Sequence, residues 1–338
     1  MSTSTLPGDR AGSSSLRDLV ARALTPRGVF GMALAATIAT WIMLLIGGTV
    51  NPTGSSLACD WSPSDLLFPT CNGAAFPEMK GGVLFEHGHR LWGWLVGIFT
   101  TATLIGAWAG RDIAPNTRWM ALGAFFLVLA QGALGGLTVV LGLNPYVSTG
   151  HLVVGYSFLA TMVVLTWRLA PSRRATPTLG TTLPRGTLTA LTLLALGQIV
   201  LGGVIRHFGA GFACGADPIG CSGQGLWPAL GLGKLHMAHR LLGYLVAVLV
   251  LVFAWRARRS ALAAGRTPIA ALALLPIALV LAQVGLGLLT VMTREVIVVA
   301  FHTAFGGLLL ANLVALRTGF GPLGDQTRAA APAKGARA

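Results

Sequence analysis

The stretch VLFEHGHRLWGWLVGIFTTATLIGAWA, residues 83–109, decides the fold. It is apolar over most of its length, and as a helix it is long enough to cross the roughly 30 Å hydrocarbon core of a bilayer. Near its start it carries Glu86 and His89, followed by Arg90 and Leu91. Residues 233–255, GKLHMAHRLLGYLVAVLVLVFAW, have the same character and repeat the His-Arg-Leu sequence. Since ionisable groups within membrane helices are costly, both stretches predict spanning helices with functional side chains.

The composition of the whole chain also indicates a membrane protein. Of its 338 residues, 54% are hydrophobic before the 45 glycines are counted, and only 10% are charged. Soluble domains have roughly 45–50% apolar residues with glycine included, and about 25% charged residues. A soluble enzyme, a disordered protein and a secreted disulfide scaffold are therefore excluded. The net charge of +14 does not indicate nucleic-acid binding, because arginine and lysine lie in short breaks between apolar runs.

We predict an all-α, polytopic membrane protein with eight transmembrane helices, arranged as two repeated four-helix bundles. Helices are expected because backbone polar groups within lipid must be satisfied inside the segment. The predicted segments are 29–50, 83–109, 119–141, 148–167, 187–205, 233–255, 268–292 and 295–316.

Internal similarity divides the chain into two halves. His89 recurs as His239, His151 recurs as His302, and the sequence LVLAQ occurs at both 127–131 and 279–283. The correspondence joins odd-numbered to odd-numbered helices, which predicts parallel repeats of the kind known from other membrane folds. The expected organisation is an N-terminal tail, an N-terminal half, a linker, a C-terminal half and a C-terminal tail, at residues 1–28, 29–170, 171–186, 187–316 and 317–338.

The basic residues predict the orientation in the membrane. Most of the 24 arginines and lysines lie in the tails, the linker and the short loops that would share one side. By the positive-inside rule, both termini are cytoplasmic and the cysteine-bearing loops are outside. The strong preference for arginine over lysine suggests a GC-rich genome, and hence the plasma (inner) membrane of a bacterium.

Four histidines recur at similar depth, near the starts of the even-numbered segments, and each has a glycine four residues later. Residues i and i+4 share a helix face, so each glycine would leave a flat surface beside an imidazole. One such pair alone more often indicates helix packing, and zinc would need a tighter cluster with more ligands. Four repeated pairs favour two haem sites with two histidine ligands each. The pairs are His89 with Gly93, His151 with Gly155, His239 with Gly243, and His302 with Gly306.

The two halves differ at one chemically important position. Glu86 lies three residues before His89, whereas His236 takes the equivalent place before His239. A carboxylate beside a haem suggests proton transfer; the alternative is a salt bridge with Arg90 or Lys80. Arg90 and Arg240 are candidates for binding haem propionates, because arginine favours carboxylates.

All four cysteines lie in the two large outer loops. An even number on the oxidising side predicts two disulfides, and one per loop is the simplest pairing: Cys59–Cys71 and Cys214–Cys221. We expect the second to hold its loop together. A redox role for the first is the weaker alternative to the same structural role.

These residues resemble the haem A synthase family over nearly the whole chain. The specific marks are Glu86-x-x-His89-Arg90, His151, His239-Arg240 and His302, together with the paired-cysteine loop CGADPIGC at 214–221. The resemblance implies oxidation of the C8 methyl of haem O to a formyl group, which gives haem A for cytochrome oxidase assembly.

The resemblance also implies roles for the two halves. His89 and His151 would hold the substrate haem O beside a catalytic Glu86, and His239 and His302 would hold a permanent haem b for electron transfer. The implied partners are the enzyme that supplies haem O, an electron acceptor and the lipid bilayer. Two other functions fit the histidines: a di-haem b-type membrane electron carrier, and a haem transporter or chaperone.

Overall fold

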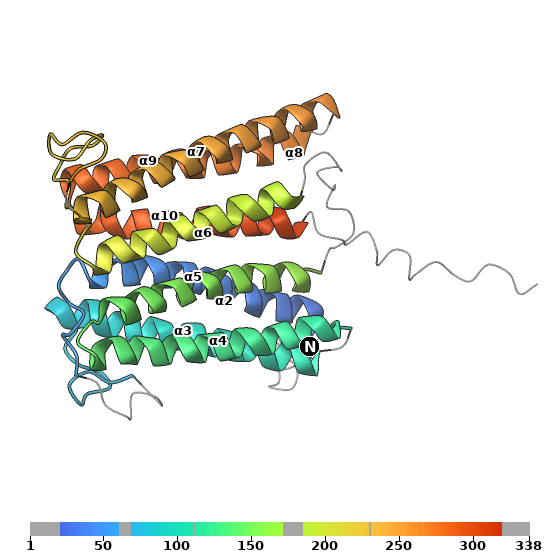
Figure 1. Ribbon diagram of the computed structural model, residues 1–338. Coiled ribbons are helices and arrows are strands. Elements are labelled where there is room, and N and C mark those ends of the chain that lie inside the picture. The colour runs from blue at the N-terminus through green and yellow to red at the C-terminus, as the bar shows by residue number, and fades with distance from the viewer. Residues whose placement is uncertain are drawn as a thin grey trace, which may run out of the picture.

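A computed structural model describes residues 21–60, 69–110, 112–171, 185–229, 231–265 and 267–319. Every named element in these ranges is a helix, and eight helices are long and apolar enough to cross a membrane, as the sequence predicts. Figure 1 shows them running side by side along one common direction. The greater parts of the predicted tails 1–28 and 317–338 and of the linker 171–186 lie outside the described residues.

The predicted segments all coincide with helices. In the N-terminal half these are α2 (Pro26–Val50), α3 (Gly81–Ala109), α4 (Pro115–Val140) and α5 (Pro145–Leu169). In the C-terminal half they are α6 (Arg185–His207), α7 (Gly231–Ala263), α8 (Thr267–Leu272), α9 (Leu274–Thr293) and α10 (Val296–Gly319).

Capping residues explain where two helices begin. Thr25 precedes α2, and its side chain accepts a hydrogen bond from the N–H of Gly28 at 3.1 Å. Asn144 precedes α5, and its side chain accepts from two N–H groups of the first turn. Both helices have proline at their first position, where its missing N–H is not needed. The predicted start at 148 is therefore three residues too late.

Two larger differences from the predicted segments lie in the C-terminal half. The segment expected at 268–292 is interrupted between Leu272 and Leu274. Pro276 has no N–H to donate to the carbonyl of Leu272, and a proline ring clashes with the carbonyl four residues earlier. The other difference is α7, which continues beyond the predicted end at 255, because its arginine-rich extension consists of good helix formers.

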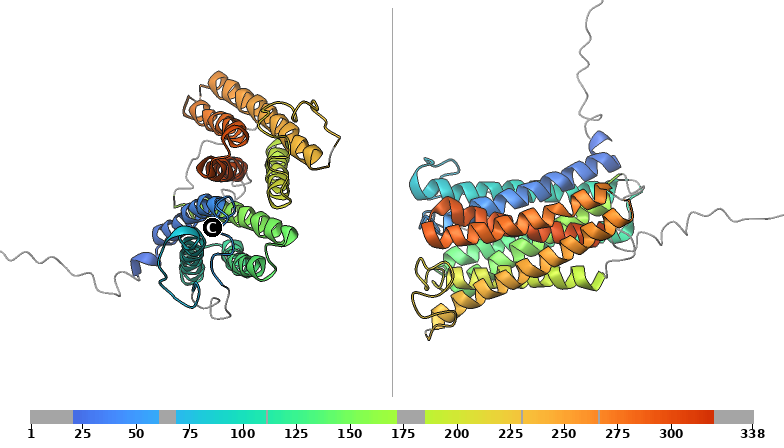
Figure 2. Two further views of the ribbon diagram at one scale, coloured as in Figure 1. Left: turned by 90° about the vertical axis from the view of Figure 1, so that its left-hand side faces the viewer. Right: turned by 90° about the horizontal axis from the view of Figure 1, so that it is seen from above.

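The helices form two groups of four. Within the first, α2 contacts α3 and α5, and α4 contacts α3 and α5; α6, α7, α9 and α10 form an equivalent ring. The end-on view in Figure 2 shows the two groups lying next to each other. Helices α2 and α5 contact α10, and α5 also contacts α6. This neighbour pattern agrees with two four-helix halves; their origin as repeats stays a prediction.

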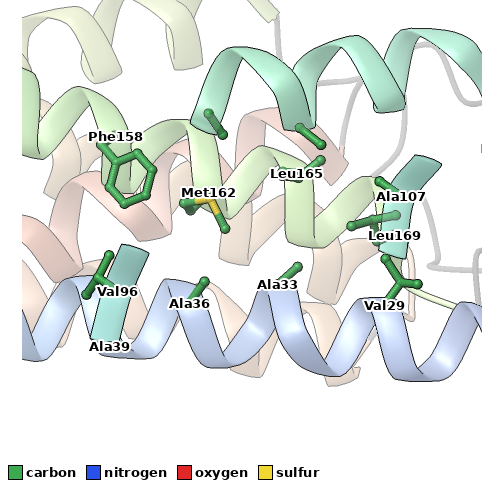
Figure 3. Close-up of a cluster of buried hydrophobic side chains, with 12 residues drawn as sticks. Val29, Ala33, Ala36, Ala39, Val96, Ala107, Phe158, Met162, Leu165 and Leu169 are labelled. Atoms are coloured by element: carbon green, nitrogen blue, oxygen red, sulfur yellow. The ribbon is translucent and has the colours of Figure 1, made fainter. Parts of the chain in front are cut away.

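The core of the first half joins large side chains to small ones. Figure 3 shows Phe158, Met162 and Leu165 of α5 facing α2, from which Ala33 and Ala36 point back. All five are buried. Small residues on one helix allow close approach of the other, which is how membrane helices gain packing energy without water to exclude.

The contact between the halves is also close. A Cβ added at Gly48 of α2 would lie only 2.9 Å from the Cα of Ala300 on α10. Trp41 and Tyr156 each donate a side-chain hydrogen bond to a backbone carbonyl of α10. From the other half, Arg206 of α6 donates to the carbonyl of Gly48 at 3.1 Å. The two halves are therefore joined by direct backbone packing.

We expect Gly48→Ala to destabilise the protein by about 1–3 kcal/mol, because the added methyl group meets backbone that must shift. Gly31 is the matched control, since it lies on the same helix and an added Cβ there meets nothing within 4 Å. Gly31→Ala should be neutral or slightly stabilising. Thermal unfolding in detergent compares the two variants, and equal stability would contradict the packing described here.

Candidate functional site

Each of the four repeated histidines packs its imidazole against a glycine of the preceding spanning helix. A Cβ there would crowd the ring, so glycine leaves room for the imidazole in this place. A Cβ added at the glycine would approach the histidine Cε1 to 2.8 Å for Gly47 and His89, 3.1 Å for Gly135 and His151, 3.0 Å for Gly202 and His239, and 3.0 Å for Gly287 and His302.

The first pair of histidines has the separation that a shared metal ion needs. The ring centroids of His89 on α3 and His151 on α5 are 6.5 Å apart, and the ring planes are inclined at 74°. Two imidazoles that bind one metal from opposite sides have centroids about 6 Å apart, because each metal–nitrogen bond is about 2 Å long.

The surroundings of these imidazoles fit a haem better than a bare ion. The Nδ1 atoms of all four histidines are buried and make no hydrogen bond within the described part of the chain. Those same residues contain no group of three or more histidine, cysteine or acidic side chains that could hold a metal. A metal at either pair must therefore bring further ligands with it, as haem iron does.

The predicted flat surface beside each imidazole is covered by a neighbouring side chain. The amide nitrogens of three glutamines lie over the glycines four residues after the histidines, and a methionine takes this place over Gly93. A Cβ added at the glycine would be 3.0 Å from Gln131 Nε2 at Gly155, 2.9 Å from Gln198 Nε2 at Gly243, 3.3 Å from Gln283 Nε2 at Gly306, and 3.0 Å from Met43 Cε at Gly93.

The sequence carries a signal for these covering residues. Each is followed four residues later by the glycine that touches the imidazole, in the pairs Met43–Gly47, Gln131–Gly135, Gln198–Gly202 and Gln283–Gly287. Gln131 and Gln283 end the two copies of the repeated sequence LVLAQ, and the Nε2 of Gln131 lies 3.4 Å from the Nε2 of His151. The sequence reasoning missed Met43 and Gln198.

Glu86 is buried in an ion pair at the outer end of α3. One carboxylate oxygen accepts a hydrogen bond from Arg90 at 2.8 Å, and the other accepts from the backbone N–H of Cys59 at 2.9 Å. Lys80, the other cation considered from the sequence, pairs with Glu78 instead. At the equivalent place in α7, the imidazole of His236 accepts a hydrogen bond from Arg240. The two halves thus differ in the group that pairs with the arginine, which is a carboxylate for Arg90 and an imidazole for Arg240.

Both arginines also bind the cysteine loops. Arg90 donates to the carbonyl oxygens of Cys59, Asp60 and Thr70 at 2.9–3.2 Å. Arg240 donates to those of Asp217 and Gly220 at 2.7 and 2.8 Å. Each guanidinium therefore fastens a loop to the helix that carries a histidine. Their expected contact with haem propionates stays a prediction.

The cysteines pair as predicted, Cys59 with Cys71 and Cys214 with Cys221, and all four are buried. Figure 1 shows the two loops at the same end of the helices. In the second loop, hydrogen bonds from the N–H groups of Gly220 and Ile219 lower the pKa of Asp217. Both loops lie at the end of the bundle at which Glu86 is found (Figure 1), and the first is bonded to Glu86 through the N–H of Cys59.

Two further histidines lie apart from the ligand pairs. The Nε2 of His87 lies 3.2 Å from the carbonyl oxygen of Ala75, and the Nδ1 of His207 lies 3.1 Å from the hydroxyl of Thr149. Each of these two side chains therefore has a nearby polar group as its partner.

We expect Arg240→Ala to cost about 3 kcal/mol of stability, because two short hydrogen bonds from a charged donor are lost. Arg240→Lys should recover part of this loss, since an ammonium group can reach one carbonyl. Thermal unfolding of the purified protein in detergent measures both variants. Unfolding of Arg240→Ala at the wild-type temperature would show that the arginine does not hold the second loop.

Comparison with known proteins identifies the family. The sequence model described as cytochrome oxidase assembly protein matches residues 30–314. A protein of Symbiobacterium thermophilum named "Heme A synthase" is 30% identical over 237 residues, which cover 68% of this chain and 75% of that protein. The "Heme A synthase" of Geobacillus kaustophilus is 28% identical over 302 residues, covering 86% and 92%.

A third relative, the "Heme A synthase" of Shewanella oneidensis, is 34% identical over 215 residues, covering 56% of this chain and 63% of that protein. With its eight apolar helices and these bacterial relatives, the protein is a multi-pass bacterial membrane protein. The match over nearly all of the spanning region shows that the chain belongs to the haem A synthase family of cytochrome oxidase assembly proteins.

Proposed function

We propose that this protein is a haem A synthase, an oxidoreductase that converts the C8 methyl of haem O to a formyl group. The observation that carries the proposal is a buried carboxylate, Glu86, one helical turn from a histidine pair with the spacing of a shared metal. Family membership supports the same function. A di-haem electron carrier and a haem transporter are not favoured, because neither needs a carboxylate in only one half.

The two halves have different tasks in this proposal. His89 and His151 hold the iron of the substrate, haem O, in the half formed by residues 29–170. His239 and His302 hold a permanent haem b in the half formed by residues 187–316, where it supplies a path for electrons. The difference between Glu86 and His236 supports this division, since it places the acidic group in one half only.

Glu86 acts as the catalytic carboxylate. When electrons pass to an acceptor, oxidation of a methyl to a formyl group takes its oxygen from water and releases protons as well as electrons. A buried carboxylate can accept and pass on such protons at its oxygens. Arg90 and the N–H of Cys59 fix both oxygens of Glu86, so the group is held in place before substrate arrives. Fixed groups avoid the cost of reorganisation during the reaction.

The membrane arrangement follows from the charge distribution. Both termini face the cytoplasm and both cysteine loops face outward, in a bacterial plasma membrane. The histidines then lie toward the outer surface, covered by the two disulfide loops. Haem O comes from the enzyme that makes it, electrons leave to an acceptor, and haem A is delivered for cytochrome oxidase assembly.

Expression in a bacterial host that makes haem O but lacks haem A tests this function. We expect haem A to appear in the membranes when the full chain is expressed, detected by mass after extraction. A chain with both His89 and His151 replaced by alanine is the control and should yield none. Accumulation of haem O without any haem A in the presence of the wild-type chain would contradict the proposal.

A further inference from the structure

The side chains that cover the glycines are not equivalent in the two halves. On the first helix of each half, the covering residue is Met43 in α2 and Gln198 in α6. The same helices carry the glycines that touch the imidazoles, Gly47 and Gly202. Met43 and Gln198 therefore occupy matching places beside His89 and His239, with a thioether in one half and an amide in the other.

Gln198 is bonded to the backbone of the histidine that it accompanies. Its Nε2 donates to the carbonyl oxygen of His239 at 2.8 Å, and the same nitrogen lies 3.3 Å from the imidazole Nε2. The second contact is longer than a good hydrogen bond, so little is lost when a metal takes the imidazole nitrogen. The bond to the carbonyl does not involve the imidazole and persists with haem bound.

Met43 makes no such bond, because a thioether has no N–H to donate. Its terminal methyl lies over Gly93, so its contribution beside His89 is packing alone. Trp92 donates to the carbonyl of Ala39 on α2, and this bond joins the two helices without contacting the histidine. Met43 therefore gives His89 no hydrogen bond of the kind that Gln198 gives His239.

We propose that Gln198 and Met43 determine how firmly each half retains haem. Gln198 is a positioning residue that fixes His239 and makes the C-terminal haem resident. Met43 leaves the position of His89 adjustable, so that the iron–His89 bond opens readily and the N-terminal haem can be exchanged. This inference rests on the proposed function, in which one haem is substrate and must leave as product.

The expected size of the effect follows from other metal sites. Hydrogen bonds that orient a metal ligand from the second layer typically change metal affinity by about 10- to 100-fold when they are removed. An exchangeable substrate and a permanent cofactor need such a difference in retention. Because the bond from Gln198 acts on the backbone of His239 and not on its ring, we expect an effect at the lower end of this range, about tenfold.

Exchange of the two residues tests the inference in the full chain. Met43→Gln, Gln198→Met and wild type are purified with haem b and haem O bound, then mixed with excess apomyoglobin as haem acceptor. Absorption follows release, and extraction with mass identification shows which haem remains. We expect Met43→Gln to slow release of haem O about tenfold and Gln198→Met to speed release of haem b about tenfold.

Met43→Leu is the matched control, since it keeps an apolar side chain of similar size without adding an amide. It should release haem O at the wild-type rate. Equal release rates for Met43→Gln and Met43→Leu would overturn the inference, as would wild-type retention in Gln198→Met. Faster release from Met43→Gln would also overturn it, by showing that the amide competes with iron for the imidazole. Wild-type protein that binds no haem would instead contradict the proposed function itself.

Discussion

Glu86→Gln should lower haem A formation by at least about 100-fold, the lower end of what a positioned proton-transfer group contributes. Glutamine has nearly the same shape, and its single amide oxygen can accept from either the N–H of Cys59 or Arg90, which bind different oxygens of Glu86. It cannot take up and release a proton as a carboxylate does. Haem O should therefore remain bound and unconverted, as measured by mass identification of the haems extracted from membranes.

His236→Gln is the control for the Glu86 variant, because it changes the equivalent position in the C-terminal half. It should leave haem A formation near the wild-type level. A normal yield of haem A from Glu86→Gln would remove the catalytic role of this carboxylate. The ion pair with Arg90 would then be only a structural link between α3 and the first cysteine loop.

Loss of either histidine of the second pair should remove the retained haem. In His239→Ala and His302→Ala, only one of the two histidines that would hold the haem iron in this proposal remains. We expect the purified variants to contain haem b at a small fraction of the wild-type amount. Absorption spectra and extraction of haem from the purified protein measure this loss.

His207→Ala is the matched control for the histidine variants. Its imidazole contacts Thr149 and belongs to neither pair, so its removal should leave the haem content unchanged. Unchanged spectra in both His239→Ala and His302→Ala would show that these residues do not bind the iron. The assignment of haem b to the C-terminal half would then be wrong.

The transmembrane fold is predictable from sequence for a simple physical reason. A long apolar segment in a bilayer must satisfy its own backbone polar groups and therefore forms a helix, so all eight spans are found near their predicted positions. Their ends depend on local chemistry and are less certain. The caps at Thr25 and Asn144 move two helix starts earlier, and Pro276 interrupts a segment that hydropathy alone makes continuous.

The four histidines are predictable as a set because the repeat makes them stand out. The ion pair of Glu86 with Arg90 is one of the alternatives that the sequence offers, but the bond from the N–H of Cys59 is not, since it depends on how the first cysteine loop folds over the end of α3. For the same reason the bonds that Arg90 and Arg240 donate to loop carbonyls are not apparent from the sequence. Loop conformation does not follow from helix periodicity.

The residues that cover the glycines could not be predicted from the sequence for a different reason. Met43 and Gln198 are unremarkable members of apolar segments when each helix is considered alone. They become significant only when α2 is placed against α3 and α6 against α7, which brings them over Gly93 and Gly243. A search for residues four positions before a glycine on the odd-numbered spans would have found them.

The account's central claim is that one half holds a substrate and the other a permanent cofactor. Extraction and mass identification of the haems from purified protein, expressed with a source of haem O, tests it most directly. We predict haem b together with haem O, its hydroxylated form or haem A, in equal amounts per chain. Haem b alone, occupying both histidine pairs, would contradict the claim and indicate an electron carrier.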